Sequence, residues 1–172
     1  MNLIRLFKDF LRGQQNLDLL RKRGLELGQN VNIEKGVVIE PSMPWLVTIG
    51  NNVTLGPQVY ILAHDASTKI PMGVTKVGRV TIGNNVFVGA RTIILPNVSI
   101  GDNVVIGAGS IVSKDIESNS VVVGNPARKI STLDEYVKKN KEIYNMVGKS
   151  SQEEIKYENH FNKHKSRLRF VD

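Results

Sequence analysis

Residues 82–112 read IGNNVF VGARTI ILPNVS IGDNVV IGAGSI V when they are divided into groups of six. Every group opens with an aliphatic residue, from Ile82 through Val112, and its second residue is often Gly. Four places after the opening residue stands a second small or β-branched residue, such as Val86 or Val104. A period of six does not suit an α-helix, because six residues make about 1.7 helical turns and the apolar stripe would wander around the axis.

The same spacing extends toward the N-terminus. It appears at two further runs of opening residues: Leu27, Ile33 and Ile39, then Ile49, Leu55 and Ile61. Gly-Asn-Asn and Gly-Asp-Asn triplets, such as Gly83-Asn84-Asn85, supply residues that tolerate a turn or left-handed backbone. Since no hexad can bury its own apolar residue, the units must stack coil upon coil. The pattern predicts an all-β solenoid, a parallel β-helix.

Two interruptions break the spacing. Between Ile39 and Ile49 the step is ten, so four residues within Pro41–Thr48 are extra. Between Ile61 and Ile82 the step is 21, so 21 − 6 = 15 residues form a protruding loop at about Ala66–Val80. Loops of that length in compact repeats are commonly functional.

Over about residues 27–130 the hexads resemble those of the hexapeptide-repeat acyltransferases, in particular the sugar and polysaccharide O-acetyltransferases. The resemblance implies a left-handed winding with 18 residues per coil. It also implies a homotrimer, with active sites in clefts between neighbours, and acetyl-CoA as the co-substrate.

His64 is the only histidine in the repeat region. It breaks the register and begins the long loop, and Ile61-Leu62-Ala63-His64 occupies the segment where the family carries its catalytic His. Imidazole titrates near neutrality and can take a proton from a hydroxyl. Asp65 is a second candidate catalytic residue, although adjacent side chains on an extended segment point to opposite sides. Asp65, Glu34, Glu40 and a backbone carbonyl are the candidate groups that orient the ring.

The resemblance also indicates donor-binding residues. The backbone amide near Ala90, in Val88-Gly89-Ala90-Arg91, faces the thioester oxygen, and Ala108 lies in a small-residue coil along the pantetheine arm. Ser113 and Lys114 in Val112-Ser113-Lys114-Asp115, with Arg128 and Lys129 after Gly124-Asn125-Pro126, resemble the C-terminal signature, whose cations contact phosphates.

These features predict direct transfer of an acetyl group to a hydroxyl of a sugar or polysaccharide precursor, with His64 as general base. The chain has no Cys, which fits a reaction without a covalent enzyme intermediate. Amino-sugar N-acylation is the alternative within the enzyme class, and a non-catalytic scaffold is the alternative outside it. We expect no metal site, since zinc enzymes on this solenoid need three His ligands, whereas His160 and His164 lie in a Lys-rich tail.

The net charge of +7 is spread evenly. Residues 1–26, 27–130 and 131–172 carry nets of 6 − 3 = +3, 8 − 6 = +2 and 9 − 7 = +2. Without a basic stripe, and with five Phe and four Tyr in 172 residues, the chain does not look like a nucleic-acid-binding protein. No apolar run of membrane-spanning length or signal peptide is evident, so we expect a cytoplasmic protein.

The flanks predict helices. Met1–Arg12 has an amphipathic pattern, which suits either a cap on the open end of the solenoid or a weak contact with a membrane surface. Thr132 and Glu135 form a capping-box pattern that begins a helix to about Met146, and Ser151 with Glu154 suggests another. The predicted organisation is a cap at 1–26, a β-helix at 27–130 and a helical tail at 131–172.

Overall fold

The structure is a computed structural model that describes residues 15–148, with side-chain environments as far as residue 141. The predicted helix at Met1–Arg12, the predicted helix from Ser151, and both tail histidines lie outside the described residues. The chain divides into two compact units, and the boundary between them in the sequence falls between Leu133 and Asp134.

Three sheets built from short strands form the coils of the first unit, and a fourth sheet of two strands forms a hairpin within residues 64–77. Sheet A contains β1 (Glu26–Leu27), β4 (Val47–Ile49), β9 (Val80–Ile82) and β12 (Val98–Ile100). Sheet B contains β2 (Asn32–Ile33), β5 (Thr54–Leu55), β10 (Val86–Val88), β13 (Val104–Ile106), β15 (Ser120–Val123) and β16 (Arg128–Thr132). Sheet C contains β3 (Val38–Ile39), β6 (Tyr60–Ile61), β11 (Ile93–Ile94) and β14 (Ile111–Val112).

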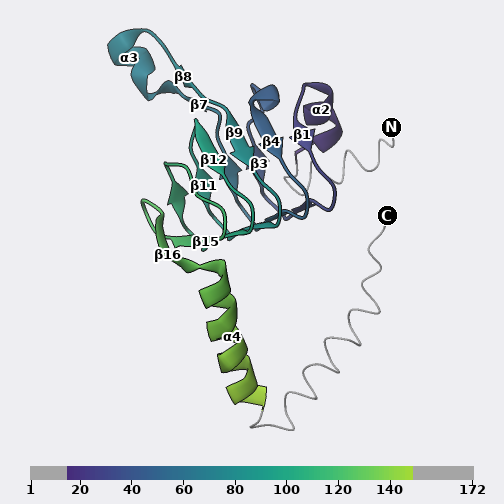
Figure 1. Cartoon of the computed structure of the whole chain (residues 1–172). Helices are drawn as coiled ribbons and strands as arrows, with labels where there is room; N and C mark the ends of the chain where they lie inside the picture. Colours follow the sequence, from purple (N-terminus) through teal and green to yellow (C-terminus); the bar gives the residue numbers. More distant parts are fainter. Residues whose placement is uncertain (1–14, 149–172) are drawn as a thin grey trace. The chain divides into compact units, whose positions relative to one another are not determined.

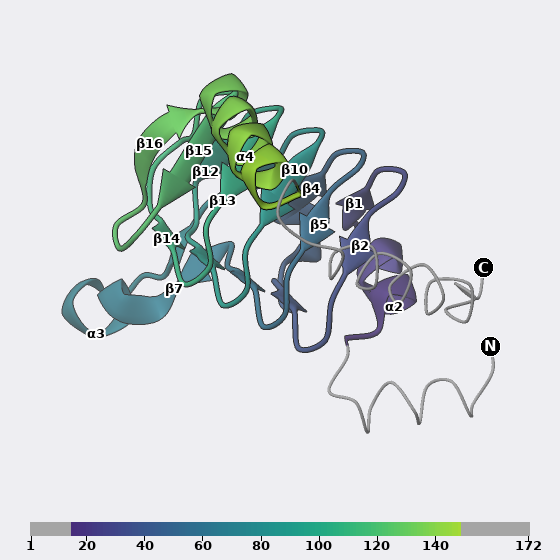
Figure 2. The same cartoon turned by 90° about the horizontal axis from the view of Figure 1, so that it is seen from below.

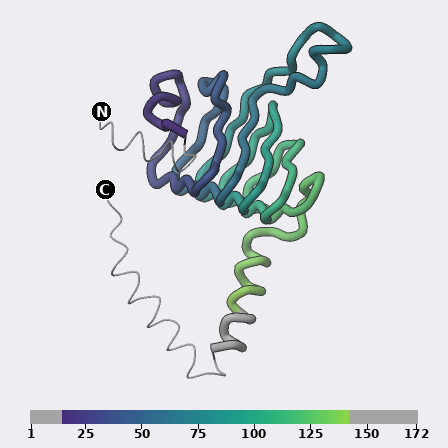
Figure 3. The backbone as a smooth tube through the Cα atoms, turned by 180° about the vertical axis from the view of Figure 1, so that it is seen from behind, coloured from purple at the N-terminus to yellow at the C-terminus, as the bar shows by residue number. Residues whose placement is uncertain are grey.

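The chain passes through sheets A, B and C in turn and then repeats, which gives the stacked coils seen in Figures 2 and 3. Val86 pairs in parallel with Val104, 104 − 86 = 18 residues later, as the sequence predicts for three hexads. Pairing is parallel throughout these sheets except between β15 and β16, which are antiparallel. The predicted parallel solenoid is therefore confirmed for this unit.

The opening residues of the hexads form the core. Those from Ile39 to Val112 are at most 2% exposed, while Leu27 and Ile33 at the first coil are half-buried. The second set of inward positions is also buried from Val37 onward, and two of its members, Thr92 and Ser110, are polar with no exposed surface. Inward aliphatic residues thus stack in ladders along the axis, as the period of six requires.

One corner of the coil is built from asparagines in the left-handed region. Asn30, Asn52, Asn85, Asn103 and Asn119 have φ between 55° and 58°. Their side chains are joined along the stack by hydrogen bonds of 3.0 Å, from Asn30 to Asn52, Asn52 to Asn85, and Asn85 to Asn103. The turn residues therefore also tie neighbouring coils together.

Both interruptions of the hexad spacing are structured. The first contains the 3₁₀ turn η1 (Pro44–Leu46). The second is a hairpin in which β7 (His64–Asp65) pairs antiparallel with β8 (Lys76–Val77), with η2 (Ala66–Thr68) and α3 (Lys69–Met72) between them. Figure 1 shows α3 at the tip of this hairpin, away from the stacked coils. The predicted protruding loop is confirmed, and its strand pairing begins at His64.

Helices flank the coils in sequence. Helix α2 (Leu17–Lys22) precedes the first coil and buries Leu20 against the core. Helix α4 (Leu133–Gly148) begins directly after Thr132, where the capping-box pattern predicts a helix. Within residues 15–148, no helix is both long enough and apolar enough to cross a bilayer.

Candidate active site

The candidate site starts from two residues that the coil stacking brings together. Ile39 of β3 pairs with Ile61 of β6, so the coil between them spans 61 − 39 = 22 residues, four more than a regular coil. Glu40 follows β3, and its amide donates to the carbonyl of Ile61. His64 begins β7 shortly after β6. Residues 24 apart in the sequence therefore become neighbours just past the ends of the adjacent strands β3 and β6.

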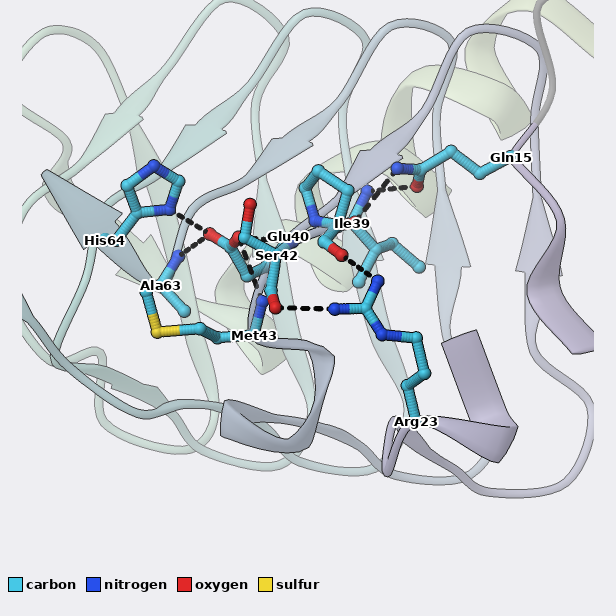
Figure 4. Close-up of polar contacts among 9 residues, drawn as sticks. Gln15, Arg23, Ile39, Glu40, Ser42, Met43, Ala63 and His64 are labelled. Carbon is cyan, nitrogen blue, oxygen red and sulfur yellow. Dashed lines mark hydrogen bonds and ion pairs between the residues drawn. The ribbon is translucent and has the colours of Figure 1, made fainter. Parts of the chain in front are cut away.

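The Glu40 carboxylate is fully buried and accepts four hydrogen bonds (Figure 4). Oε2 accepts from the amide of Ala63 at 3.0 Å and lies 2.7 Å from Nδ1 of His64. Oε1 accepts from the amides of Ser42 at 2.9 Å and Met43 at 3.3 Å. Burial raises the pKa of Glu40, but the bonds from Ala63, His64 and Ser42 together lower it below its ordinary value. The carboxylate is ionised at neutral pH.

The tautomer of His64 follows from this contact. An ionised carboxylate can only accept, so Nδ1 of the neutral ring carries the proton and donates it to Glu40. Nε2 is then the basic nitrogen, and Figure 4 shows it on the side of the ring away from Glu40. The His64 side chain is 35% exposed, so the ring is within reach of a small molecule from solvent.

Of the candidate groups that could orient the ring, the structure selects Glu40. Asp65 instead caps η2, accepting from the amide of Ser67 at 2.8 Å, and forms an ion pair with Lys76 at 3.4 Å. Those bonds from Ser67 lower the pKa of Asp65. Glu34 accepts from the Asn32 side chain at 2.9 Å. As the alternation along an extended segment suggests, Asp65 does not contact the imidazole of its neighbour.

Ala90 and Ala108 occupy equivalent places on two stacked coils, each directly after a glycine that follows a sheet B strand. A Cβ on Gly89 would meet the amide nitrogen of Ala108 at 2.4 Å, so only glycine permits this close approach. The carbonyl of Ala90 accepts from Gly109, whereas within residues 15–148 no acceptor is recorded for the amides of Ala90 and Ala108.

Three of the predicted donor-binding cations line one pocket. Lys114, Arg128 and Lys129 surround a cavity of about 270 Å³ together with Asp115 and Glu117. The residues come from the end of β14 and from β16, which the reversal after β15 brings back toward it. Ser113 precedes Lys114, is exposed, and does not line the cavity.

Along sheet C, Ile61, Ile94 and Val112 are successive partners. Strand β14, which precedes Lys114, therefore lies two strand spacings from β6, which precedes His64, or about 10 Å at roughly 4.8 Å per strand.

Two side chains before the first coils hold the segment around Glu40, and neither was predicted from the sequence. The Gln15 amide bonds both the nitrogen and the carbonyl of Ile39, at 2.6 and 3.1 Å. The Arg23 guanidinium bonds the carbonyls of Pro41 and Ser42 (Figure 4). Neither residue belongs to the hexads, so the repeat pattern contains no signal for them.

Comparison with known proteins establishes the family. Residues 79–114 match the model of the bacterial transferase hexapeptide (six repeats). The chain is similar to protein CapG of Staphylococcus aureus, with 39% identity over 140 residues that cover 77% of this chain and 80% of CapG. The chain belongs to the hexapeptide-repeat family of acyltransferases.

Solved structures of this family share the fold. A maltose O-acetyltransferase from Clostridium difficile 630 matches with a TM-score of 0.55 and 34% identity, covering 67% of this chain and 73% of that one. A galactoside acetyltransferase in complex with coenzyme A matches with a TM-score of 0.56 and 32% identity, covering 71% of this chain and 72% of that one. The predicted resemblance to sugar O-acetyltransferases is confirmed at the level of the family.

Proposed function

We propose that this acyltransferase transfers the acetyl group of acetyl-CoA to a hydroxyl of a sugar or a polysaccharide precursor. The observation that carries the proposal is the pair formed by a half-exposed His64 and a fully buried, ionised Glu40. A carboxylate on Nδ1 fixes the tautomer of the ring and stabilises the imidazolium that forms when Nε2 takes a proton. The likeness to maltose and galactoside acetyltransferases supports the acceptor class.

For the donor, the chain offers backbone amides and cations at separate places along the coils. The amides of Ala90 and Ala108, without acceptors among the described residues, suit the thioester and the pantetheine arm. The cavity lined by Lys114, Arg128 and Lys129 carries the positive charge that the phosphates of coenzyme A require. Ser113 lies beside it as a further polar contact. Coenzyme A in the related galactoside acetyltransferase supports this choice of donor.

The reaction then needs no covalent enzyme intermediate. Nε2 of His64 accepts the proton of the acceptor hydroxyl as its oxygen attacks the thioester carbonyl carbon. The amide of Ala90 stabilises the negative charge on the tetrahedral oxygen. When the C–S bond breaks, the imidazolium returns its proton to the sulfur, so coenzyme A leaves as the thiol and the product is an ester. We assign Asp65, which follows His64 on the hairpin, a role in contacting the acceptor rather than the imidazole.

The remaining family features complete the proposal. We place the reaction in the cytoplasm, where acetyl-CoA is available, in a homotrimer of left-handed β-helices. The outward side chains of sheet C support side-by-side packing because they are largely apolar: Val38, Tyr60, Ile93 and Ile111. Tyr60, which is 43% exposed, gives this face surface to bury against a neighbour.

The test is thiol release from acetyl-CoA in the presence of a panel of neutral sugars, amino sugars and oligosaccharides. We expect an alkali-labile ester product with neutral sugars. His64→Ala should lower kcat by roughly 10²–10⁴, the loss expected for a general base, while acetyl-CoA still binds. Turnover equal to wild type would exclude His64 from the mechanism. Products that resist alkali would favour N-acylation, and failure of the wild type to bind acetyl-CoA would favour a scaffold.

A further inference from the structure

Arg23, the residue that ends α2, makes two short hydrogen bonds to a segment of the next coil. Nη1 donates to the carbonyl of Pro41 at 2.7 Å, and Nη2 donates to the carbonyl of Ser42 at 2.8 Å. Each bond is charge-assisted, and the planar guanidinium matches two neighbouring acceptors as a lysine could not. The hexad pattern does not require this contact, because Pro41 and Ser42 belong to the four-residue insertion.

The two peptide groups that Arg23 binds are the same two that hold Glu40. The Pro41 carbonyl and the Ser42 amide share one peptide group, and the Ser42 carbonyl and the Met43 amide share the next. These amides donate to Oε1 of Glu40 at 2.9 and 3.3 Å. Each peptide group is thus bonded to the guanidinium through its oxygen and to the carboxylate through its nitrogen, as Figure 4 shows.

Such a chain of bonds is cooperative. A cation on the carbonyl oxygen polarises the peptide group and makes its N–H a stronger donor to an anion. Donation runs from the guanidinium through two peptide groups to Oε1 of Glu40, and Nδ1 of His64 donates to Oε2 of the same carboxylate. Because Glu40 is fully buried, it depends on these donors in place of water.

The end of α2 is also packed tightly on this insertion, which limits the movement of Arg23. Gly24 has φ of +98°, and a Cβ there would lie 2.8 Å from Cβ of Trp45 in η1. On either side of Arg23, Leu20 and Leu25 are buried in the core. The guanidinium therefore starts from a fixed backbone position next to the segment that it binds.

We propose that Arg23 is a positioning residue for the acetyl transfer, holding the Glu40–His64 pair in its reactive arrangement through the two peptide groups of Pro41–Met43. The proposal rests on the function proposed above. Without Arg23, the two carbonyls are free to turn toward water, the amides of Ser42 and Met43 leave Oε1, and the carboxylate loses half of its donors. The imidazole then loses its fixed orientation and tautomer, although it remains present.

A double-mutant cycle separates this role from simple support of a surface segment. We expect Arg23→Met to lower kcat about 10-fold, as is common for residues that orient catalytic ligands, with the KM for acetyl-CoA changed less than about twofold. Glu40→Gln should lower kcat by a similar or larger factor. In the Glu40→Gln background, Arg23→Met should change kcat by less than about twofold, because its path to His64 is already broken. An equal 10-fold loss in both backgrounds would overturn the proposal.

Matched variants control for folding and charge. Lys22→Met removes a cation from the same helix, and within residues 15–148 the structure records no hydrogen bond or ion pair for the Lys22 side chain. We expect it to keep wild-type kcat. Arg23→Lys keeps the charge and the stem but cannot bond both carbonyls with a planar fork, so it should also lower kcat while retaining the wild-type melting temperature. Wild-type kcat in Arg23→Lys would contradict the role of the fork.

A spectroscopic measurement tests the proposal independently of turnover. In protein with ¹⁵N-labelled histidine, the proton on Nδ1 of His64, identified by its absence in His64→Ala, should resonate at low field because it is bonded to a carboxylate. We expect that signal to persist in Lys22→Met, to weaken or broaden in Arg23→Met, and to disappear in Glu40→Gln. An unchanged signal in Arg23→Met would overturn the proposal. If the signal weakens in Arg23→Met but the wild type acetylates no acceptor, the proposed function fails while the positioning of the Glu40–His64 pair by Arg23 stands.

Discussion

The regular coil at residues 82–99 and the interrupted segment at residues 39–81 both contribute strands to sheets A, B and C, but they bury side chains of different kinds. In the regular coil the inward side chains are aliphatic apart from Thr92, and all are at most 2% exposed. In the interrupted segment, a carboxylate is buried as completely as its neighbour Ile39. The two insertions in the hexad spacing begin directly after Glu40 and around His64.

This difference shows what a charge requires inside a solenoid. In a regular coil the strand amides bond the neighbouring coil, and the amides of residues 82–99 that donate to a carboxylate reach Asp102 and Asp115, neither of which is buried. The insertion at Pro41–Thr48 releases the amides of Ser42 and Met43 from that pattern and turns them toward Glu40. Stability thus comes from the repeat, and the reactive pair comes from the departures from it.

The largest effect on stability should come from the regular coil. Ile82 lies in the middle of sheet A and is 1% exposed, so Ile82→Ala should lower the free energy of unfolding by about 2–5 kcal/mol through lost burial and a cavity. Ile82→Val, the matched control, should cost about 0.5–1.5 kcal/mol. Urea denaturation measures both. The kcat of the folded variants should match wild type, and a parallel loss of kcat would break the division between repeat and site.

The repeat was predictable because its signal is local and repeated. A period of six with Gly and Asn at the turns allows only stacked short strands, and the burial of Ile39 through Val112 follows from it. The position of His64 was likewise marked by the break in register. Lys114, Arg128 and Lys129 were predicted as separate cations, and they share one cavity because β16 reverses onto β15.

The partner of His64 could not be chosen from the sequence. Glu34, Glu40, Asp65 and a carbonyl were all open, because the choice depends on how four inserted residues shift one coil against the next. Strand pairing of Ile39 with Ile61 is what brings Glu40 beside the imidazole. The contact of Arg23 lies further from any pattern, since it joins a helix end to backbone carbonyls, which leave no trace in the choice of residues.

A smaller effect should appear in how the free energy of unfolding depends on pH, because the interrupted segment buries a carboxylate and the regular coil does not. The pKa of Glu40 is lower in the folded protein than its ordinary value, so the ionised carboxylate stabilises the fold at neutral pH. That contribution is lost as the pH falls from above the ordinary pKa of a glutamate through the lower pKa of Glu40 in the folded protein. Glu40→Gln should therefore be less stable than wild type by about 1.5–3 kcal/mol at pH 7. The difference in stability between wild type and Glu40→Gln should begin to narrow as the pH falls below about 5, toward the ordinary pKa of a glutamate, and should narrow further as the pH falls through the lower pKa of Glu40 in the folded protein.

Urea denaturation of both proteins across this range provides the measurement, with Gln29→Ala as a control that alters an exposed amide side chain and no carboxylate contact. We expect the control to run parallel to wild type at all pH values. A constant gap between wild type and Glu40→Gln would mean that ionisation of Glu40 contributes nothing to folding, and the contrast between the two regions would lose its electrostatic basis.

The smallest effects should come from the corner that both regions share. Asn85 has φ of +56° and is bonded through its side chain to Asn52 and Asn103. Asn85→Gly keeps the left-handed backbone but loses these exposed bonds, so it should cost about 0.5–1 kcal/mol. Asn85→Ala should cost roughly 1 kcal/mol more, because a Cβ disfavours that backbone. Urea denaturation measures the free energy of unfolding of both variants. A larger loss in Asn85→Ala than in Asn85→Gly shows that the left-handed backbone also favours asparagine at this position. Equal losses would mean that the asparagine contributes only its side-chain hydrogen bonds.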